Sequence, residues 1–148
     1  MSAAALVIGY GSPIRGDDAI GVLAAERLAS MSLPPWVQIQ ARHILTAELA
    51  EDLSQIERVV FLDAAVDLPP GQVRCQPLTP QTQGLSTMAH FHHPAELLAW
   101  AERLYGHAPD AWLITVGGAS FDYAHCQLSP PAEAAIEPMI ERVLELLQ

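Results

Sequence analysis

The chain has 148 residues, of which 51% are hydrophobic and 16% charged, and its formal net charge is −10. This length and composition predict one compact domain over residues 1–148, with a core of its own. The negative charge excludes nucleic acid and anionic membrane as principal partners, because both require a basic surface. No apolar run reaches the ~20 residues of a membrane span, and the first residues lack the basic region of a signal peptide, so we expect a cytoplasmic protein.

Strand and helix patterns alternate along the chain. Helical spacing of apolar residues indicates helices from about residue 18 to 31, 46 to 56, 94 to 104 and 129 to 147. Pro138 should kink the last of them or mark a short first turn. Residues 72–77 follow a Pro-Pro-Gly turn with no crossover helix before them, so they are expected to form an antiparallel edge strand. The strand patterns lie at residues 3–8, 36–41, 58–65, 72–77 and 111–117.

This alternation predicts an α/β fold. We expect a three-layer α/β/α sandwich around a mostly parallel twisted sheet of about five strands. The polar, aperiodic segment 78–93 interrupts the pattern, and it is interpreted as a functional loop that acts as a mobile flap.

A glycine-rich loop after the first strand leads to two adjacent carboxylates, Asp17 and Asp18. Ligands of open α/β sheets bind beyond the carboxyl ends of the strands, which is where these two residues fall. Either aspartate could instead cap the following helix and complement its dipole. Capping accounts for one aspartate and leaves the other for chemistry. The spacing of the glycines matches no dinucleotide fingerprint, and a P-loop is excluded because the chain has no lysine.

A third carboxylate, Asp63, ends the apolar strand Val59-Val60-Phe61-Leu62. A carboxylate at the end of a buried strand is costly unless it is paired or faces a cleft, although Asp63 could also cap the next turn. If the first and third strands are neighbours, Asp18 and Asp63 lie on one rim of the sheet. They would repel each other there unless a cation bridged them.

Three histidines, His90, His92 and His93, precede the helix that begins near Pro94. His92 or His93 could occupy the helix N-cap region, and a loop histidine is often simply solvated. Carboxylate oxygens with an imidazole nitrogen suit zinc, nickel, copper or cadmium. Two carboxylates and one histidine would leave a coordination position open to a further ligand. Cys75 and Cys126 form no Cys-x-x-Cys pair and are interpreted as buried, inert thiols.

Four motifs occur in order over nearly the whole chain. Taken together, they resemble those of the nickel–iron hydrogenase maturation endopeptidases. The motifs are Gly9-Tyr10-Gly11-Ser12 with Asp17-Asp18-Ala19-Ile20-Gly21, Leu62-Asp63-Ala64, His90 ahead of Glu96-Leu97-Leu98, and Leu128-Ser129-Pro130 with Ile136-Glu137-Pro138.

The resemblance implies a single-domain α/β peptidase that removes a C-terminal extension from the hydrogenase large-subunit precursor after nickel insertion. It implies that Asp18, Asp63 and His90 bind metal and that Asp18 and Asp63 are the catalytic candidates. His90 is chosen because it alone keeps the family-like distance to Leu97-Leu98. Nickel would arrive with the substrate, and zinc or cadmium could occupy the same site.

Two segments depart from the family pattern. Ser12 stands where the family usually has asparagine, and residues 42–48 replace a common Asp-Gly-Gly-Thr stretch. No Gly-x-Ser-x-Gly elbow is present, so hydrolysis would use water activated by a metal or by a rim carboxylate. Two other hypotheses are a non-catalytic nickel-binding checking or scaffold protein in hydrogenase assembly and an unrelated metal-dependent hydrolase of small substrates.

Overall fold

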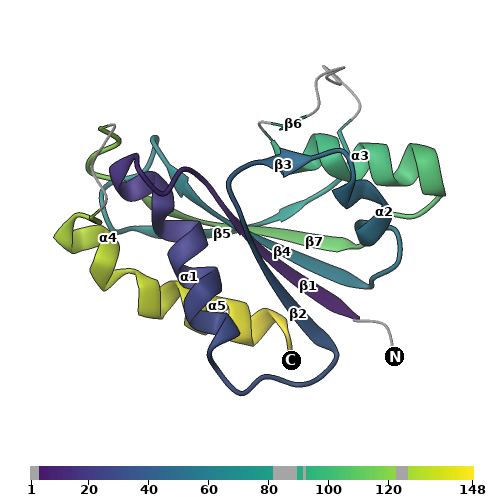
Figure 1. The fold of residues 1–148 in the computed structure, drawn as a ribbon, viewed down its shortest axis with the longest axis horizontal. Helices are drawn as coiled ribbons and strands as arrows, with labels where there is room; N and C mark the ends of the chain where they lie inside the picture. Colours follow the sequence, from purple (N-terminus) through teal and green to yellow (C-terminus); the bar gives the residue numbers. More distant parts are fainter. Residues whose placement is uncertain (1–3, 82–89, 92, 123–126) are drawn as a thin grey trace.

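The computed structural model describes residues 4–81, 90–91, 93–122 and 127–148, with the backbone alone described at 90 and 91. It contains a five-stranded sheet with the order β2-β1-β4-β7-β5 (Figure 1). The first four strands are parallel to their neighbours, and β5 runs antiparallel to β7, as predicted for the edge strand. The strands are β1 (Ala5–Tyr10), β2 (Val37–Arg42), β4 (Arg58–Ala65), β5 (Val73–Leu78) and β7 (Asp110–Gly117).

Helices cover both faces of the sheet, which confirms the predicted three-layer α/β/α sandwich. In Figure 1, α1, α4 and α5 lie on one side of the sheet, and α2 and α3 lie on the other. The helical elements are η1 (Gly16–Ala19), α1 (Ile20–Ala29), α2 (Leu49–Leu53), α3 (Pro94–Tyr105), α4 (Pro130–Ala134) and α5 (Ile136–Leu146).

The core is divided between the two faces according to the alternation of side chains along each strand. In β4, Val60 and Leu62 pack with α1 and α5, whereas Val59 and Phe61 pack with α2 and α3. Asp63 follows Val59 and Phe61 at the same two-residue spacing. Its side chain therefore lies on the α2/α3 face of the sheet, directly after the last apolar residue on that face of β4.

The predicted helices are present, with two differences in their limits. The last helix is broken at Ala135, and Pro138 is the third residue of α5, where its missing N–H costs no helical hydrogen bond. The second helix is shorter than predicted, because Leu45–Thr46 forms the strand β3 and pairs antiparallel with β6 (His90–Phe91). This two-stranded sheet had no periodic signal in the sequence, because each of its strands is only two residues long.

The strand order creates a switch point between β1 and β4. The chain passes from β1 to β2 on one side and then crosses to β4 on the other side of β1. Connections that leave a sheet in opposite directions open a crevice beyond the carboxyl ends of the two central strands. Asp18 follows β1 and Asp63 is the third residue from the end of β4, so both lie at the carboxyl ends of these two strands.

Glycines allow the start of α1 to lie directly on the backbone of the central strands. A Cβ atom on Gly9 would lie 2.0 Å from the carbonyl oxygen of Gly21, and one on Gly21 would lie 2.2 Å from the carbonyl oxygen of Leu62. Any larger residue would push the helix away from β1 and β4. These close contacts therefore determine how near Asp18 comes to Asp63.

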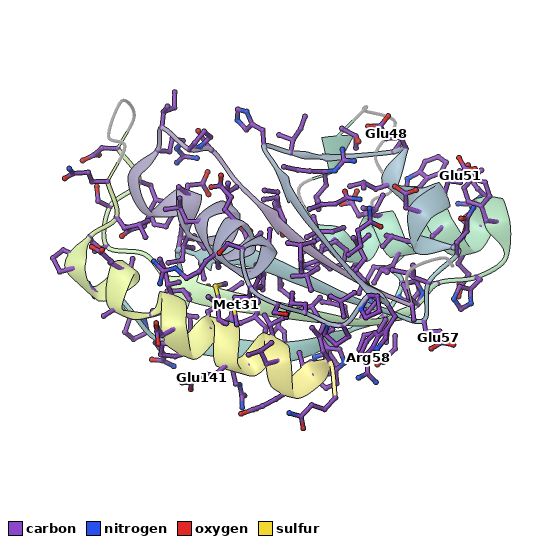
Figure 2. All side chains as sticks on the ribbon, turned by 60° about the horizontal axis from the view of Figure 1, so that its bottom comes forward. Met31, Glu48, Glu51, Glu57, Arg58 and Glu141 are labelled. Atoms are coloured by element: carbon purple, nitrogen blue, oxygen red, sulfur yellow. The ribbon has the colours of Figure 1, made fainter. Side chains whose placement is uncertain are left out.

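The amino end of the sheet is held by a separate set of contacts around Arg58, which Figure 2 shows near the end of α5. Its guanidinium pairs with Asp110 at 2.9 Å and donates to the carbonyl oxygen of Leu146. Within the described residues, no helix has the length and apolarity needed to cross a membrane.

We predict that Gly21→Ala destabilises the protein by about 3 kcal/mol or more, because the new methyl group overlaps the backbone of β4. Helix propensity alone would favour alanine by about 1 kcal/mol. The control is Gly106→Ala, where φ is 79° and no heavy atom lies within 4 Å of the new Cβ. It should cost about 1–2 kcal/mol from backbone strain. Urea unfolding checks both values, and a smaller loss for Gly21→Ala than for Gly106→Ala would contradict the close-contact argument.

Candidate functional site

Asp63 lies beside Tyr10 at the carboxyl ends of β4 and β1. The pairing of these parallel strands runs through Gly9 and Leu62, so the next residues along, Tyr10 and Asp63, are neighbours on the α2/α3 face. The Tyr10 hydroxyl forms a hydrogen bond with the Asp63 carboxyl group, and the Ala64 N–H donates to Asp63 Oδ1 at 2.8 Å. The Tyr10 ring also packs edge-on against Phe61, with centroids 6.4 Å apart.

The surroundings of Asp63 disfavour its charged form. Burial raises the pKa of Asp63 to about 7, and the nearby charge of Asp18 adds to the rise, while the hydrogen bonds from Ala64 and Tyr10 offset part of it. The pKa of Tyr10 lies well above its ordinary value because of burial and because of the charges of Asp63 and Asp18. Tyr10 therefore remains a neutral hydrogen-bond donor.

Asp18 occupies the 3₁₀ turn η1 with its side chain 21% exposed. Its Oδ2 accepts from the Ser12 N–H at 2.9 Å and lies 4.0 Å from Nη1 of Arg15. Gly11 allows this packing, since a Cβ there would lie 2.1 Å from the Asp18 carbonyl oxygen. Ser12 contacts Asp18 through its backbone, so this contact does not depend on the departure from the family's asparagine.

Asp17 has a different role from its neighbour. It is completely buried, and Oδ2 accepts from the N–H groups of Ala119 at 2.7 Å and Ser120 at 3.2 Å. Ser129 donates its N–H to Oδ1 and its hydroxyl to Oδ2, both at 2.7 Å. The turn η1 has no side-chain cap, so the capping interpretation of Asp17 is wrong. The carboxylate instead joins the turn after β1 to the loop after β7 and to the start of α4.

These donors determine the charge state of Asp17. Burial alone would raise its pKa, but the hydrogen bonds from Ser129, Ala119 and Ser120 outweigh burial and hold the pKa of Asp17 below its ordinary value. The ionised form therefore stabilises the folded state. Sequence reasoning missed this role because the donors come from positions more than 100 residues away.

We predict that Asp17→Asn lowers the free energy of unfolding by about 3 kcal/mol at neutral pH, because the amide turns its N–H₂ toward other donors. The stability supplied by ionised Asp17 is fully present above the ordinary aspartate pKa of about 4 and is lost as the pH falls through its lower folded pKa. The difference between wild type and Asp17→Asn should therefore shrink below about pH 4.

Urea unfolding between pH 3 and pH 7 measures this difference, with Asp52→Asn on the exposed side of α2 as the control. A pH-independent difference would contradict the assignment of Asp17 as the ionised acceptor.

The histidines near α3 separate into different roles. His93 is the N-cap of α3, where its Nδ1 accepts from the Ala95 N–H at 3.1 Å, in agreement with one of the two capping alternatives. The backbone of His90 pairs with Thr46 in the β3–β6 sheet. The side chain of His90, all of His92, and residues 82–89 of the flap predicted over 78–93 lie outside the described residues. His90 as a ligand therefore stays a prediction.

Among the side chains that the structure describes, no three histidine, cysteine, aspartate or glutamate residues gather as a metal-ligand set. The described part of the predicted ligand set is thus the pair Asp18 and Asp63. A divalent cation needs a third protein ligand or ligands from its own carrier in addition to this pair.

The segment 42–48, which replaces the family's Asp-Gly-Gly-Thr, adjoins the glycine loop. The carbonyl oxygens of Arg42 and His43 each accept from the Gly11 N–H at 3.2 Å. The Glu48 side chain, which Figure 2 shows near α2, accepts from Arg42 at 3.4 Å and from Thr46 at 3.2 Å. Glu48 therefore stabilises its own segment, and the contact with the glycine loop is made by backbone atoms.

Cys75 is partly buried and unpaired, and burial raises the pKa of its thiol. A thiol of raised pKa is a poor nucleophile at neutral pH. Cys126 lies outside the described residues.

Comparison with known proteins decides the family. HybD, a hydrogenase maturating endopeptidase from E. coli, is 29% identical over 97% of this chain and 91% of its own, with a TM-score of 0.78. A hydrogenase 2 maturation peptidase from a Thaumarchaeota archaeon is 30% identical over 97% of both chains, with a TM-score of 0.74. The chain belongs to the hydrogenase maturation endopeptidases. It is therefore a peptidase.

Other comparisons agree in fold or find nothing. HycI, a [NiFe] hydrogenase maturation protease from Thermococcus kodakarensis, shares the fold, with a TM-score of 0.75 at 24% identity over 98% of this chain and 92% of its own. No family model matches the sequence. No curated protein matches it either.

For this maturation endopeptidase we predict that Asp63→Asn changes the pH dependence of stability with a sign opposite to that of Asp17→Asn. The folded protein holds a proton on Asp63 up to about pH 7, whereas the unfolded chain releases it near pH 4, so wild type loses stability as the pH rises between these values. Asp63→Asn lacks this loss. Urea unfolding at pH 5 and pH 8 should show that the free energy of unfolding of Asp63→Asn, relative to that of wild type, is higher at pH 8 than at pH 5.

Proposed function

We propose that this endopeptidase removes the C-terminal extension of a nickel–iron hydrogenase large-subunit precursor after nickel has been inserted. The observation that carries the proposal is the placement of Asp18 and Asp63 together at the switch point of a chain that belongs to this family. HybD and the Thaumarchaeota protein, at 29% and 30% identity, are named as maturation peptidases of hydrogenases. The negative net charge of −10 also suits a partner that presents a cation.

In this proposal Asp18, Asp63 and His90 bind the nickel that the precursor presents. The fit rests on the donor set: two neighbouring carboxylates, one of which has a raised pKa because it is buried close to the charge of the other. A cation placed between them would relieve that repulsion. The β3–β6 pairing supports His90 as the third ligand, because β3 follows the carboxyl end of β2 and holds the His90 backbone. Zinc or cadmium would suit the same donors.

Peptide hydrolysis needs an activated water, and the raised thiol pKa of Cys75 argues against covalent catalysis by this cysteine. Asp18 and Asp63 are positioned to hold a cation or to accept a proton from the attacking water. Tyr10 supports the second carboxylate through its hydrogen bond.

The surface around the carboxyl ends of the strands suits a protein substrate. Each loop that leaves β1, β2 and β4 carries an exposed apolar side chain: Ile14 at 49%, Ile44 at 47% and Val66 at 82% exposure. We propose that these three side chains contact the precursor when it is bound. We place this encounter in the cytoplasm, where the sequence led us to expect the protein.

The direct test is incubation of the purified protein with nickel-loaded and nickel-free large-subunit precursors, followed by mass measurement of the large subunit. Loss of a C-terminal peptide from the nickel-loaded form alone supports the proposal. Stable binding of the nickel-loaded precursor without cleavage would instead support a checking or scaffold role.

We predict that Asp18→Asn and Asp63→Asn each lower the rate of precursor cleavage at least about 100-fold, while both proteins remain folded. Loss of groups that merely support a metal ligand costs about 10–100-fold, so loss of a ligand should cost at least as much. Asp52→Asn is the matched control and should cleave like wild type. Asp17→Asn should lose cleavage only in proportion to its unfolded fraction.

Circular dichroism at the assay temperature gives that fraction. A folded Asp63→Asn protein with wild-type cleavage would contradict the assignment of the acidic pair.

A further inference from the structure

Asp63 belongs to a row of polar side chains that crosses the sheet, and this polar row consists of Tyr10, Asp63, Thr115 and Arg74. Asp63 pairs in register with Thr115 of β7, which in turn pairs with Arg74 of β5. Register partners on neighbouring strands are about 5 Å apart and point to the same face of the sheet. Thr115 is therefore the β7 neighbour of Asp63, as Tyr10 is its β1 neighbour.

Thr115 is a buried polar residue whose hydroxyl has no structural use within the described part of the chain. It is 4% exposed, and its Oγ1 has no hydrogen-bond partner among the described residues. The residues that precede it on the same side of β7, Ala111 and Leu113, are apolar and packed in the α2/α3 core. A buried hydroxyl without a partner costs free energy, and valine would fill the same space without that cost.

Arg74, the next residue of the polar row, limits which groups could accept a hydrogen bond from the Thr115 hydroxyl. Its Nη1 and Nη2 pair with Asp67 at 3.1 and 3.3 Å, while its buried Nε has no partner within the described part of the chain. Arginine can only donate. The Arg74 side chain itself therefore offers no acceptor to the Thr115 hydroxyl, and the neighbouring acceptor in the polar row is the Asp63 carboxylate.

We propose that Thr115 is a positioning residue for Asp63: in the working site its hydroxyl donates to the Asp63 carboxylate and fixes the orientation of that group. This inference rests on the proposed function and adds a residue to it. The Ala64 N–H already holds Oδ1 from the β4 backbone. The Tyr10 hydroxyl bonds the same carboxyl group from β1. A further donor from β7 would hold the carboxylate from the strand on its other side as well, and would restrict its rotation away from the cation and the scissile peptide.

The test compares Thr115→Val, which removes the hydroxyl and keeps the shape, with Thr115→Ser, which keeps the hydroxyl. Ile114→Val is the matched control, because it shortens a fully buried side chain on the opposite side of the same strand. The readouts are the thermal midpoint of the free protein and the kcat and KM for cleavage of the nickel-loaded precursor.

We expect Thr115→Val to have a thermal midpoint equal to or above that of wild type and a kcat about tenfold lower, which corresponds to about 1.4 kcal/mol. Its KM should change by less than about twofold, because the hydrogen bond acts on the reacting group and not on binding of the precursor. Thr115→Ser should keep kcat within about twofold of wild type. Ile114→Val should lower the midpoint and leave kcat unchanged.

Three results would overturn the inference while the proposed function stands: a wild-type kcat for Thr115→Val, equal losses of kcat for the valine and serine variants, or a midpoint for Thr115→Val below that of Ile114→Val. The last would show that the hydroxyl has a structural partner. A wild-type protein that cleaves no nickel-loaded precursor would overturn the proposed function, and the role of Thr115 with it.

Discussion

The contact between the start of α1 and the backbone of β1 and β4 is the constraint on which the acidic site depends. Because Gly9 and Gly21 have no Cβ atoms, the backbones of the helix and the strands lie so close together that a single added methyl group would overlap them. This contact brings the turn that carries Asp18 onto the end of the strand that carries Asp63. Packing thus explains why the motif has glycine at these two positions. The glycines affect the site because the close packing sets the distance between the Asp18 and Asp63 carboxylates.

The adjacent aspartates of the motif are used in opposite ways because their surroundings differ. Asp17 is surrounded by four donors, so its charge stabilises the junction of the loops after β1 and β7 with α4. Asp18 keeps one backbone donor and remains partly exposed beside Asp63. Asp17 therefore holds the turn η1 in place, and this turn positions Asp18 beside Asp63.

Much of the fold follows from periodicity, whereas the site follows only in part. The five strands, the antiparallel edge and the broken last helix all have local signals, such as alternation, the Pro-Pro-Gly turn and Pro138. The role of Asp17 and the proposed role of Thr115 have no local signal, because they arise from partners far away in the sequence or from register across the sheet. Tyr10 was open to prediction, since Leu6, Ile8 and Tyr10 alternate toward the same face as Phe61 and Asp63.

The free protein carries two unfavourable features at one place: a carboxyl group whose charge is disfavoured by burial, and a neighbouring hydroxyl without a partner among the described residues. In the proposed function, a cation bound by Asp18 and Asp63 would favour the ionised form of Asp63, and an ionised carboxylate is a stronger acceptor for the Thr115 hydroxyl than a neutral one. A site built this way would bind the proposed cation more tightly than exposed surface carboxylates would, because binding would remove costs that folding alone leaves in place. Under both proposals the cation, Asp63 and Thr115 would then be ordered together.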